Sequence, residues 1–275
     1  MFRRNYIKTV FGLIAGGAVM PRLMAAGTPL KAPEPDFKEG EKFPLKQVDP
    51  QLADELRMIG GVLQKYRMPA PVKPSGSVRV SFYDLFDANI TQGSRTPVLI
   101  NSRIGQIAVA RRLNAPEFAV RQRFAPVVGG GVTEEVSASV NCNVDEIFSV
   151  REYETVWASS ATALPFVRRE AGAGKPALPL TVSWILMDAA GALPANEKIY
   201  RFDMLSDMTS LRRNQQLQFV RNETVPAADM QIPVKLFMQT GAGIPPIHYA
   251  VDEFNRTLFV TQGVLSWALN RIEYI

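Results

Sequence analysis

His248 and Cys142 are the only histidine and the only cysteine among the 275 residues. Nucleophilic triads and most zinc sites need one or both of these residue types, so the two positions limit the chemistry that the chain can do. Asp252 follows His248 by four residues, and in a strand this spacing places both side chains on one face. A general base oriented by a carboxylate is one interpretation, and a structural histidine is the other. The lone cysteine allows no intrachain disulfide.

Three side chains with oxygen atoms, Asp84, Asp87 and Asn89, lie close together in the sequence. Carboxylate and amide oxygens are the ligands that a hard cation such as Ca²⁺ prefers. The dense aspartate spacing and the glycine of a dedicated calcium loop are missing, so a solvated turn is the alternative interpretation. These residues are the metal-site candidates of the sequence.

A glycine-rich stretch at 172–175 is similar to part of a phosphate-binding loop. The full motif needs a glycine where Arg169 stands and a serine or threonine where Pro176 stands, so a flexible loop is the better interpretation. The sequence therefore predicts no catalytic residue and no cofactor, and it favours a protein that is not an enzyme.

Segments in which apolar and polar residues alternate fill most of the chain after residue 77, which is the pattern of half-buried strands. Gly, Pro, Asn and Asp clusters separate them at short intervals, which favours sandwich or barrel folds. The clearest are 78–82, 136–140, 180–185, 199–202, 217–221 and 234–238, with shorter runs at 97–100, 106–110, 118–124, 147–157, 247–251 and 257–260.

This pattern predicts a mainly β protein with one or two antiparallel β-sandwich domains. A jelly-roll-like sandwich is one form that these domains could take. A stretch rich in Gly, Ala and Pro at 168–179 interrupts the strands. It divides the chain into predicted domains at 69–170 and 171–275, and one continuous β domain at 69–275 is the alternative. The C-terminal residues 263–275 fit either a last strand or a short helix.

One amphipathic helix is predicted at 50–68, with Asp49 as its N-cap. Its apolar positions recur at helical spacing and line one face, which consists of Leu52, Leu56, Ile59, Leu63 and Tyr66. This face either packs on the following domain or docks on a partner subunit. Gly60–Gly61 marks a weak point of the helix or a place where another backbone comes close. Before the helix, residues 27–49 are rich in Pro, Lys and Glu and predict an extended tether.

The first 26 residues have a charged start, an apolar middle and a small-residue end, which is the layout of an export signal. The start contains Arg3, Arg4, Tyr6, Ile7 and Lys8. This arrangement resembles a twin-arginine (Tat-type) signal peptide. The resemblance covers residues 1–26 only and implies a periplasmic or extracellular protein. An uncleaved anchor or a disordered basic arm is the alternative, and membrane contact is expected only through this segment.

The net charge of +5 comes mainly from the same segment, which holds four basic residues and no acidic one. Without it the chain retains 27 of its 31 basic residues against 26 acidic ones. Because basic and acidic residues are nearly equal in number, the chain lacks the positive surface that nonspecific nucleic-acid binding requires. No nucleic-acid partner is expected.

The sequence thus favours an exported cell-envelope β-sandwich protein with a non-enzymatic binding or assembly role. Its expected partners are other protein subunits, in a homo- or hetero-oligomer. One alternative is a shell or coat subunit of double-jelly-roll type, located in a virion or shell particle. The other is an exported enzyme or cofactor-carrying subunit that uses carboxylates in place of His and Cys.

Overall fold

The structure, a computed structural model, describes residues 30–36, 40–45, 50, 52–91, 98–115, 117–124, 134–141, 152–159, 166–171, 178–206 and 210–275. The signal-like segment 1–26, Cys142, the glycine-rich stretch at 172–175 and the expected N-cap Asp49 lie outside these residues.

The described chain is mainly β-structure, as predicted. Its strands are β1 (Lys42–Leu45), β2 (Val78–Ile90), β3 (Leu99–Arg112), β4 (Glu117–Phe124), β5 (Glu134–Asn141), β6 (Glu152–Ser159), β7 (Phe166–Ala171), β8 (Leu180–Val182), β9 (Ile199–Ser206), β10 (Ser210–Ala227), β11 (Met230–Thr240), β12 (Ile247–Val251), β13 (Thr257–Gln262) and β14 (Leu265–Tyr274). The helical elements are η1 (Asp54–Ile59), α1 (Gly60–Leu63), α2 (Ser183–Ala189) and η3 (Ala190–Ala192).

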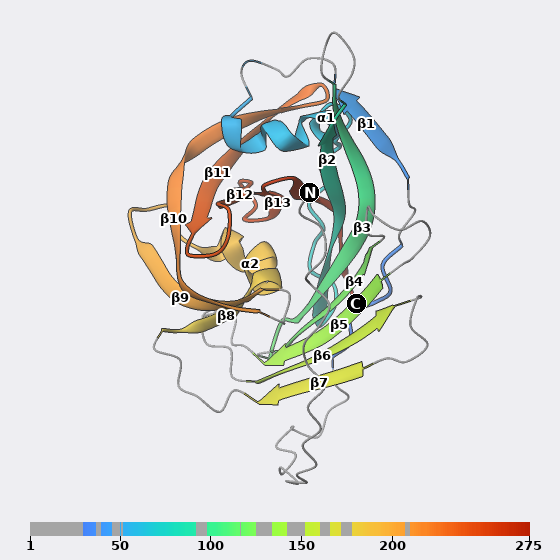
Figure 1. Ribbon diagram of the computed structural model, residues 1–275, viewed down its shortest axis with the longest axis vertical. Coiled ribbons are helices and arrows are strands. Elements are labelled where there is room, and N and C mark those ends of the chain that lie inside the picture. The colour runs from blue at the N-terminus through green and yellow to red at the C-terminus, as the bar shows by residue number, and fades with distance from the viewer. Residues whose placement is uncertain are drawn as a thin grey trace, which may run out of the picture.

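All these strands belong to one sheet, in the order β7-β6-β5-β4-β3-β2-β14-β13-β12-β11-β10-β9-β8, with β1 added beside β3. The sheet consists of two meanders, β2 to β7 and β9 to β14. They are joined where β14 pairs with β2 in antiparallel register. The only parallel pair in the described sheet is β8 with β9. The sheet curls strongly, and α2 lies inside the curl (Figure 1).

The mainly β class is confirmed, but the sandwich arrangement is not. The segments expected to form separate domains at 69–170 and 171–275 share this one sheet, because β14 of the second pairs with β2 of the first. Neither segment forms two facing sheets of a jelly roll among the described residues. The curled sheet instead buries its inner face against α2 and against itself.

The two faces of the sheet are covered by different parts of the chain, and alternation along β2 separates them. Ser81 and Tyr83 contact α2, since their hydroxyls donate to Asp188 and to the Met187 carbonyl. We call this side the α2 face. Val80 and Phe82 point the other way, where Leu30 and Ala32 pack on them. We call this side the strap face, after the N-terminal segment 30–67 that crosses it.

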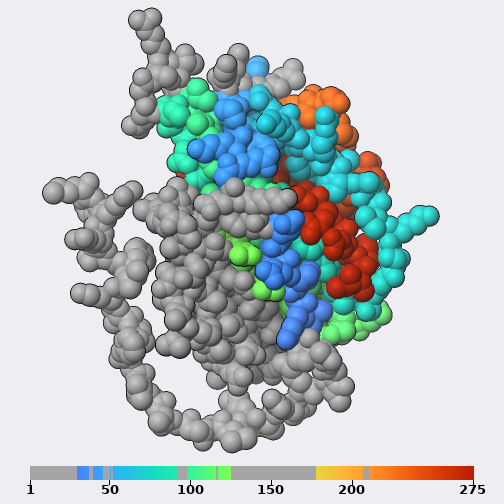
Figure 2. All heavy atoms as spheres, turned by 90° about the vertical axis from the view of Figure 1, so that its right-hand side faces the viewer, coloured from blue at the N-terminus to red at the C-terminus, as the bar shows by residue number. Residues whose placement is uncertain are grey.

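The predicted tether at 27–49 is wrong for its described parts, because they lie on the sheet. Residues 30–36 pack on the strap face, and β1 pairs with the start of β3. In Figure 2 this N-terminal segment lies on the outside of the sheet, between the early strands and the C-terminal strand. Glu34 adds ion pairs with Arg121 and Arg123, at 3.5 and 3.3 Å.

The predicted helix at 50–68 is shorter and changes type, because it consists of the 3-10 turn η1 and the single α-helical turn α1. The side chain of Asn101 explains the change. Its Oδ1 accepts a hydrogen bond from the Gly61 amide (3.0 Å), and its Nδ2 donates one to the Met58 carbonyl (2.6 Å). A β-carbon on Gly61 would overlap the carbonyl oxygen of Phe43, so another backbone does come close at this glycine pair.

The predicted strand at 180–185 is wrong after Val182, where α2 begins. Trp184, Ile185, Leu186 and Met187 are all buried, since the helix is enclosed by the sheet. An element that is buried on nearly every side shows no amphipathic periodicity that would distinguish a short helix from a buried strand. The C-terminal residues 265–274 form a strand, one of the two alternatives expected for this region.

Candidate functional site

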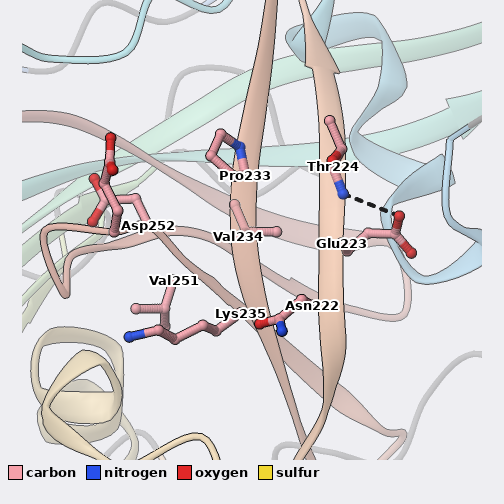
Figure 3. A pocket seen from close by; sticks show the side chains of 9 residues that line it. Asn222, Glu223, Thr224, Pro233, Val234, Lys235, Val251 and Asp252 are labelled. Atoms are coloured by element: carbon pink, nitrogen blue, oxygen red, sulfur yellow. Dashed lines mark hydrogen bonds between the residues drawn. The ribbon is translucent and has the colours of Figure 1, made fainter.

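A hollow of ≈ 370 Å³ with polar and apolar lining lies at one end of β10, β11 and β12 (Figure 3). Asn222, Lys235 and Val251 are register partners on three neighbouring strands, so they stand side by side across its floor. The remaining residues that line it are Glu223, Thr224, Pro233, Val234, Asp252 and Glu253.

The hollow exists because β12 ends before β11 does. β12 leaves the sheet after Val251, opposite Lys235, whereas β11 extends back to Met230. Pro233 stands in the part of β11 that has β10 on one side and no β12 on the other. The two-residue hairpin that joins Ala227 to Met230 makes Thr224 and Pro233 a pair whose N–H positions point away from each other. A proline at that place costs no hydrogen bond of the sheet.

Asp252 is one of the charged residues of the lining, and its carboxylate is fully engaged within the turn after β12. Its Oδ2 accepts hydrogen bonds from Arg256, and its Oδ1 accepts one from the backbone amide of Phe254 (3.0 Å). Asn255 in this turn adopts the left-handed region (φ 59°), and its side-chain oxygen accepts a hydrogen bond from the Lys235 ammonium (3.1 Å). The turn therefore fixes one wall of the hollow and holds Lys235 beside it.

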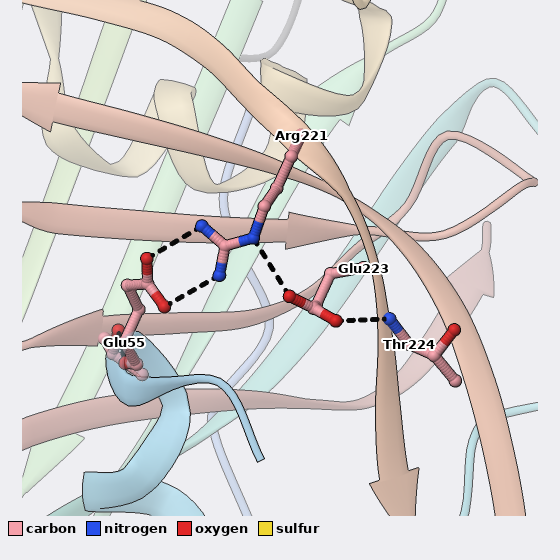
Figure 4. A network of polar contacts seen from close by, with 5 residues as sticks. Glu55, Arg221, Glu223 and Thr224 are labelled. Atoms are coloured by element: carbon pink, nitrogen blue, oxygen red, sulfur yellow. Dashed lines mark hydrogen bonds and ion pairs between the residues drawn. The ribbon is translucent and has the colours of Figure 1, made fainter. Parts of the chain in front are cut away.

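A second polar cluster lies on the strap face of the same strands (Figure 4). Arg221 donates two hydrogen bonds to the Glu55 carboxylate, both 3.0 Å, and a third to Glu223 (2.9 Å). Glu223 also accepts from the Thr224 amide (3.0 Å). The cluster attaches η1 to β10, and Thr261 supports it by donating to the Glu55 carbonyl.

These contacts shift the pKa values of the residues in the cluster. The Arg221 hydrogen bonds hold the pKa of Glu55 below its usual value, and the two carboxylates raise the pKa of Arg221. Burial lowers the pKa of the nearby His248 and so favours its neutral imidazole. The cluster is an ion-pair anchor between the strap and the sheet.

Glu55→Gln is expected to cost about 1 kcal/mol of folding free energy at pH 7, because the pair is part-exposed and bidentate. Since the folded-state pKa of Glu55 is lowered, its contribution is present above the unfolded-state pKa and is lost as pH falls through the folded-state value. Urea unfolding of wild type and variant between pH 3 and 7 should therefore give curves that converge at the acid end. A constant difference across this range would contradict the assignment.

A third cluster is buried between α2 and the α2 face of β2 and β3. Asp188 accepts a hydrogen bond from Ser81 (2.7 Å) and lies 3.6 Å from Arg79 and 4.0 Å from Arg111. The two arginines are register partners on neighbouring strands. Like charges placed opposite each other repel, and the carboxylate of α2 offsets that repulsion. The same carboxylate raises the pKa of Arg79.

The structure does not bring the three predicted metal ligands together. Asp84 and Asp87 are three residues apart in β2, so they point to opposite faces of the sheet. Asp84 accepts hydrogen bonds from Arg103, Gln106 and Asn270 (2.5–2.7 Å). Asp87 accepts one from Asn89 (2.8 Å). No cluster of three metal-ligating side chains occurs within the described ranges.

His248 and Asp252 are also not joined. His248 lies on the strap face opposite Thr261 and Met238. A register shift at Ala250/Val251 lies between His248 and Asp252, and the Asp252 carboxylate pairs with Arg256. The interpretation of His248 as a base oriented by Asp252 has no geometric support.

The apolar helix face that might have docked a partner is inside this molecule. All five side chains are buried in the main core, and the Tyr66 hydroxyl donates to the Leu269 carbonyl (2.9 Å). Tyr66 also packs its ring against Phe259. The packing alternative is the observed one, and this face is not available to a partner subunit.

Sequence reasoning did not find Arg221, Lys235 or Asn222. Each occupies a polar position of an alternating strand, which is the ordinary pattern of a solvated face. Only the register of β10, β11 and β12 shows that they gather at one end of the sheet.

Comparisons with known proteins give limited information. No family model matches the chain, and no curated protein matches it. Among solved structures, it is similar to a crystal structure described as a beta-barrel-like protein of a domain of unknown function, DUF1849, from Brucella abortus. The two are 11% identical over 74% of this chain and 100% of the other, with a TM-score of 0.40. A likeness of this degree carries no assignment of activity.

Across the part of the chain that the structure describes, no helix has the length and apolarity to cross a membrane.

Proposed function

We propose that this protein is exported to the cell envelope and acts there by binding a small polar ligand in the hollow at the end of β10–β12. The hollow is the observation that carries the proposal. Its volume of ≈ 370 Å³ falls in the range of small-molecule sites, and polar side chains from β10, β11 and the turn after β12 line it.

Rigid elements hold the lining, which favours a binding role. The floor belongs to paired strands, and the wall at Asp252 is fixed by Arg256, which also donates to the Pro69 carbonyl (2.7 Å). A site on such a scaffold loses little conformational entropy when a ligand enters. Export is supported by the sequence at Arg3–Lys8 alone, which resembles a twin-arginine signal.

The export part is tested by expressing the full chain in a bacterium and measuring the mature N-terminus by mass spectrometry. We expect cleavage after Ala25 or Ala26 and loss of export when Arg3 and Arg4 are both replaced by lysine. An intact N-terminus on a soluble cytosolic particle would contradict export and would favour the shell-subunit alternative.

The binding part is tested by a thermal-shift screen of small polar molecules against the mature protein and against Thr224→Trp, which fills the hollow. Ligands of the hollow should stabilise the wild type by several degrees and leave Thr224→Trp unchanged. Ile199→Trp, at an exposed position of β9 outside the hollow, is the control and should retain binding. Hits that bind all three proteins equally would place binding elsewhere.

A further inference from the structure

Four charged side chains line the hollow, and only two keep their charge available to a ligand. Asp252 is engaged by Arg256 and by backbone amides, and Glu223 is engaged by Arg221 and by the Thr224 amide. Lys235 uses one of its three donors on Asn255. Glu253 is exposed and makes no ion pair within the described residues. An ammonium and a carboxylate therefore remain at the same hollow.

We propose that the ligand is a small zwitterion, of the chemical class of a free amino acid. Its carboxylate pairs with the Lys235 ammonium, and its ammonium pairs with the Glu253 carboxylate. The exposed side chains of Asn222 and Thr224 supply neutral donors and acceptors between the two charges. This proposal rests on the proposed function, because it assigns the ligand of the same hollow.

The lining argues against the other common ligand classes. It contains no aromatic ring on which a sugar or a base would stack. It offers one cation, Lys235, which donates to Asn255 and keeps its other two donors, whereas phosphate groups are held by several donors. A purely cationic ligand would meet Lys235, and a purely anionic ligand would meet Glu253, so each would leave one charge of the site unmatched.

The experiment compares three probes by isothermal titration calorimetry on the mature protein: alanine, alanine amide, which has only the cation, and N-acetylalanine, which has only the anion. Alanine is expected to bind at least tenfold more tightly than either analogue. Lys235→Gln and Glu253→Gln should each reduce alanine affinity about tenfold and abolish the preference over the analogue that lacks the matching charge.

Lys42→Gln and Glu197→Gln are the matched controls, because both residues are exposed and lie outside the hollow. They should bind alanine as the wild type does. Equal affinity for all three probes, or an unchanged affinity in both hollow variants, would overturn the zwitterion assignment. If the screen finds uncharged ligands that Thr224→Trp rejects while alanine does not bind, the ligand class fails and the binding site stands. If no molecule distinguishes wild type from Thr224→Trp, both proposals fail.

Discussion

Asp188→Ala is expected to lower the free energy of unfolding by about 3–5 kcal/mol, the range for removing one partner of a buried charge cluster. The Asp188 side chain is 1% exposed, and those of Arg79 and Arg111 are 15% and 17% exposed. Without the carboxylate, two neighbouring guanidinium groups stay in a largely dry place with no opposite charge from α2. The Ser81 hydroxyl also loses its acceptor.

Urea unfolding at pH 7 checks this expectation, with the midpoint and slope measured separately. Asp188→Asn keeps the size of the side chain and removes its charge, so it should cost most of the same amount. The control is Asp54→Ala. The Asp54 carboxylate pairs with Arg57 but is 80% exposed, so its removal should change stability by less than about 1 kcal/mol. An Asp188→Ala protein as stable as the control would show that the cluster does not hold α2 in place.

Gly61→Ala is expected to destabilise the fold by about 1–3 kcal/mol, although alanine is the better helix former. Its β-carbon would overlap the Phe43 carbonyl oxygen and lie 2.8 Å from Asn101 Oδ1. Phe43 is in β1, and Asn101 holds the junction of η1 and α1, so neither atom moves without breaking a hydrogen-bonded contact. The strap would have to shift on the sheet.

Gly60→Ala is a matched comparison one residue away. The nearest atom to its added β-carbon is Leu45 Cδ2, at 2.7 Å, which is the far end of a side chain that can rotate. The gain of about 1 kcal/mol in helix propensity should offset that adjustment, so Gly60→Ala is expected to be near neutral. Thermal and urea unfolding of the two variants should separate clearly. Equal effects would mean that backbone approach at Gly61 does not limit the position of the strap.

The strands were predictable where one face is buried and the other is not. The run 234–238 lies within β11, where buried Val234 and Leu236 alternate with the more exposed Lys235. The segment 183–189 was not predictable as a helix, because the sheet buries it on all sides and removes the alternation. β1 was missed for a different reason. Its four residues include Lys42 and Pro44, which in isolation indicate a loop.

The candidate site was less predictable than the fold. A sequence shows which residues are polar, but it does not show which strand ends first or how three strands are aligned. The hollow depends on both, since it lies where β12 stops opposite Lys235. The metal prediction failed for a related reason. Asp84 and Asp87 are near in sequence, yet the period of two in a strand sends them to different faces.

The pairing of β14 with β2 determines when the sheet can be completed during translation. In the described sheet, this is the only strand pair that joins the two meanders, and β14 leaves the ribosome after every other described strand. Until then β2 and β13 present open edges beside apolar faces, and pairing between segments so distant in sequence forms slowly. The core is therefore completed only once translation has passed Tyr274. If the proposed export uses a route for folded proteins, that route would receive this sheet only after β14 has been made.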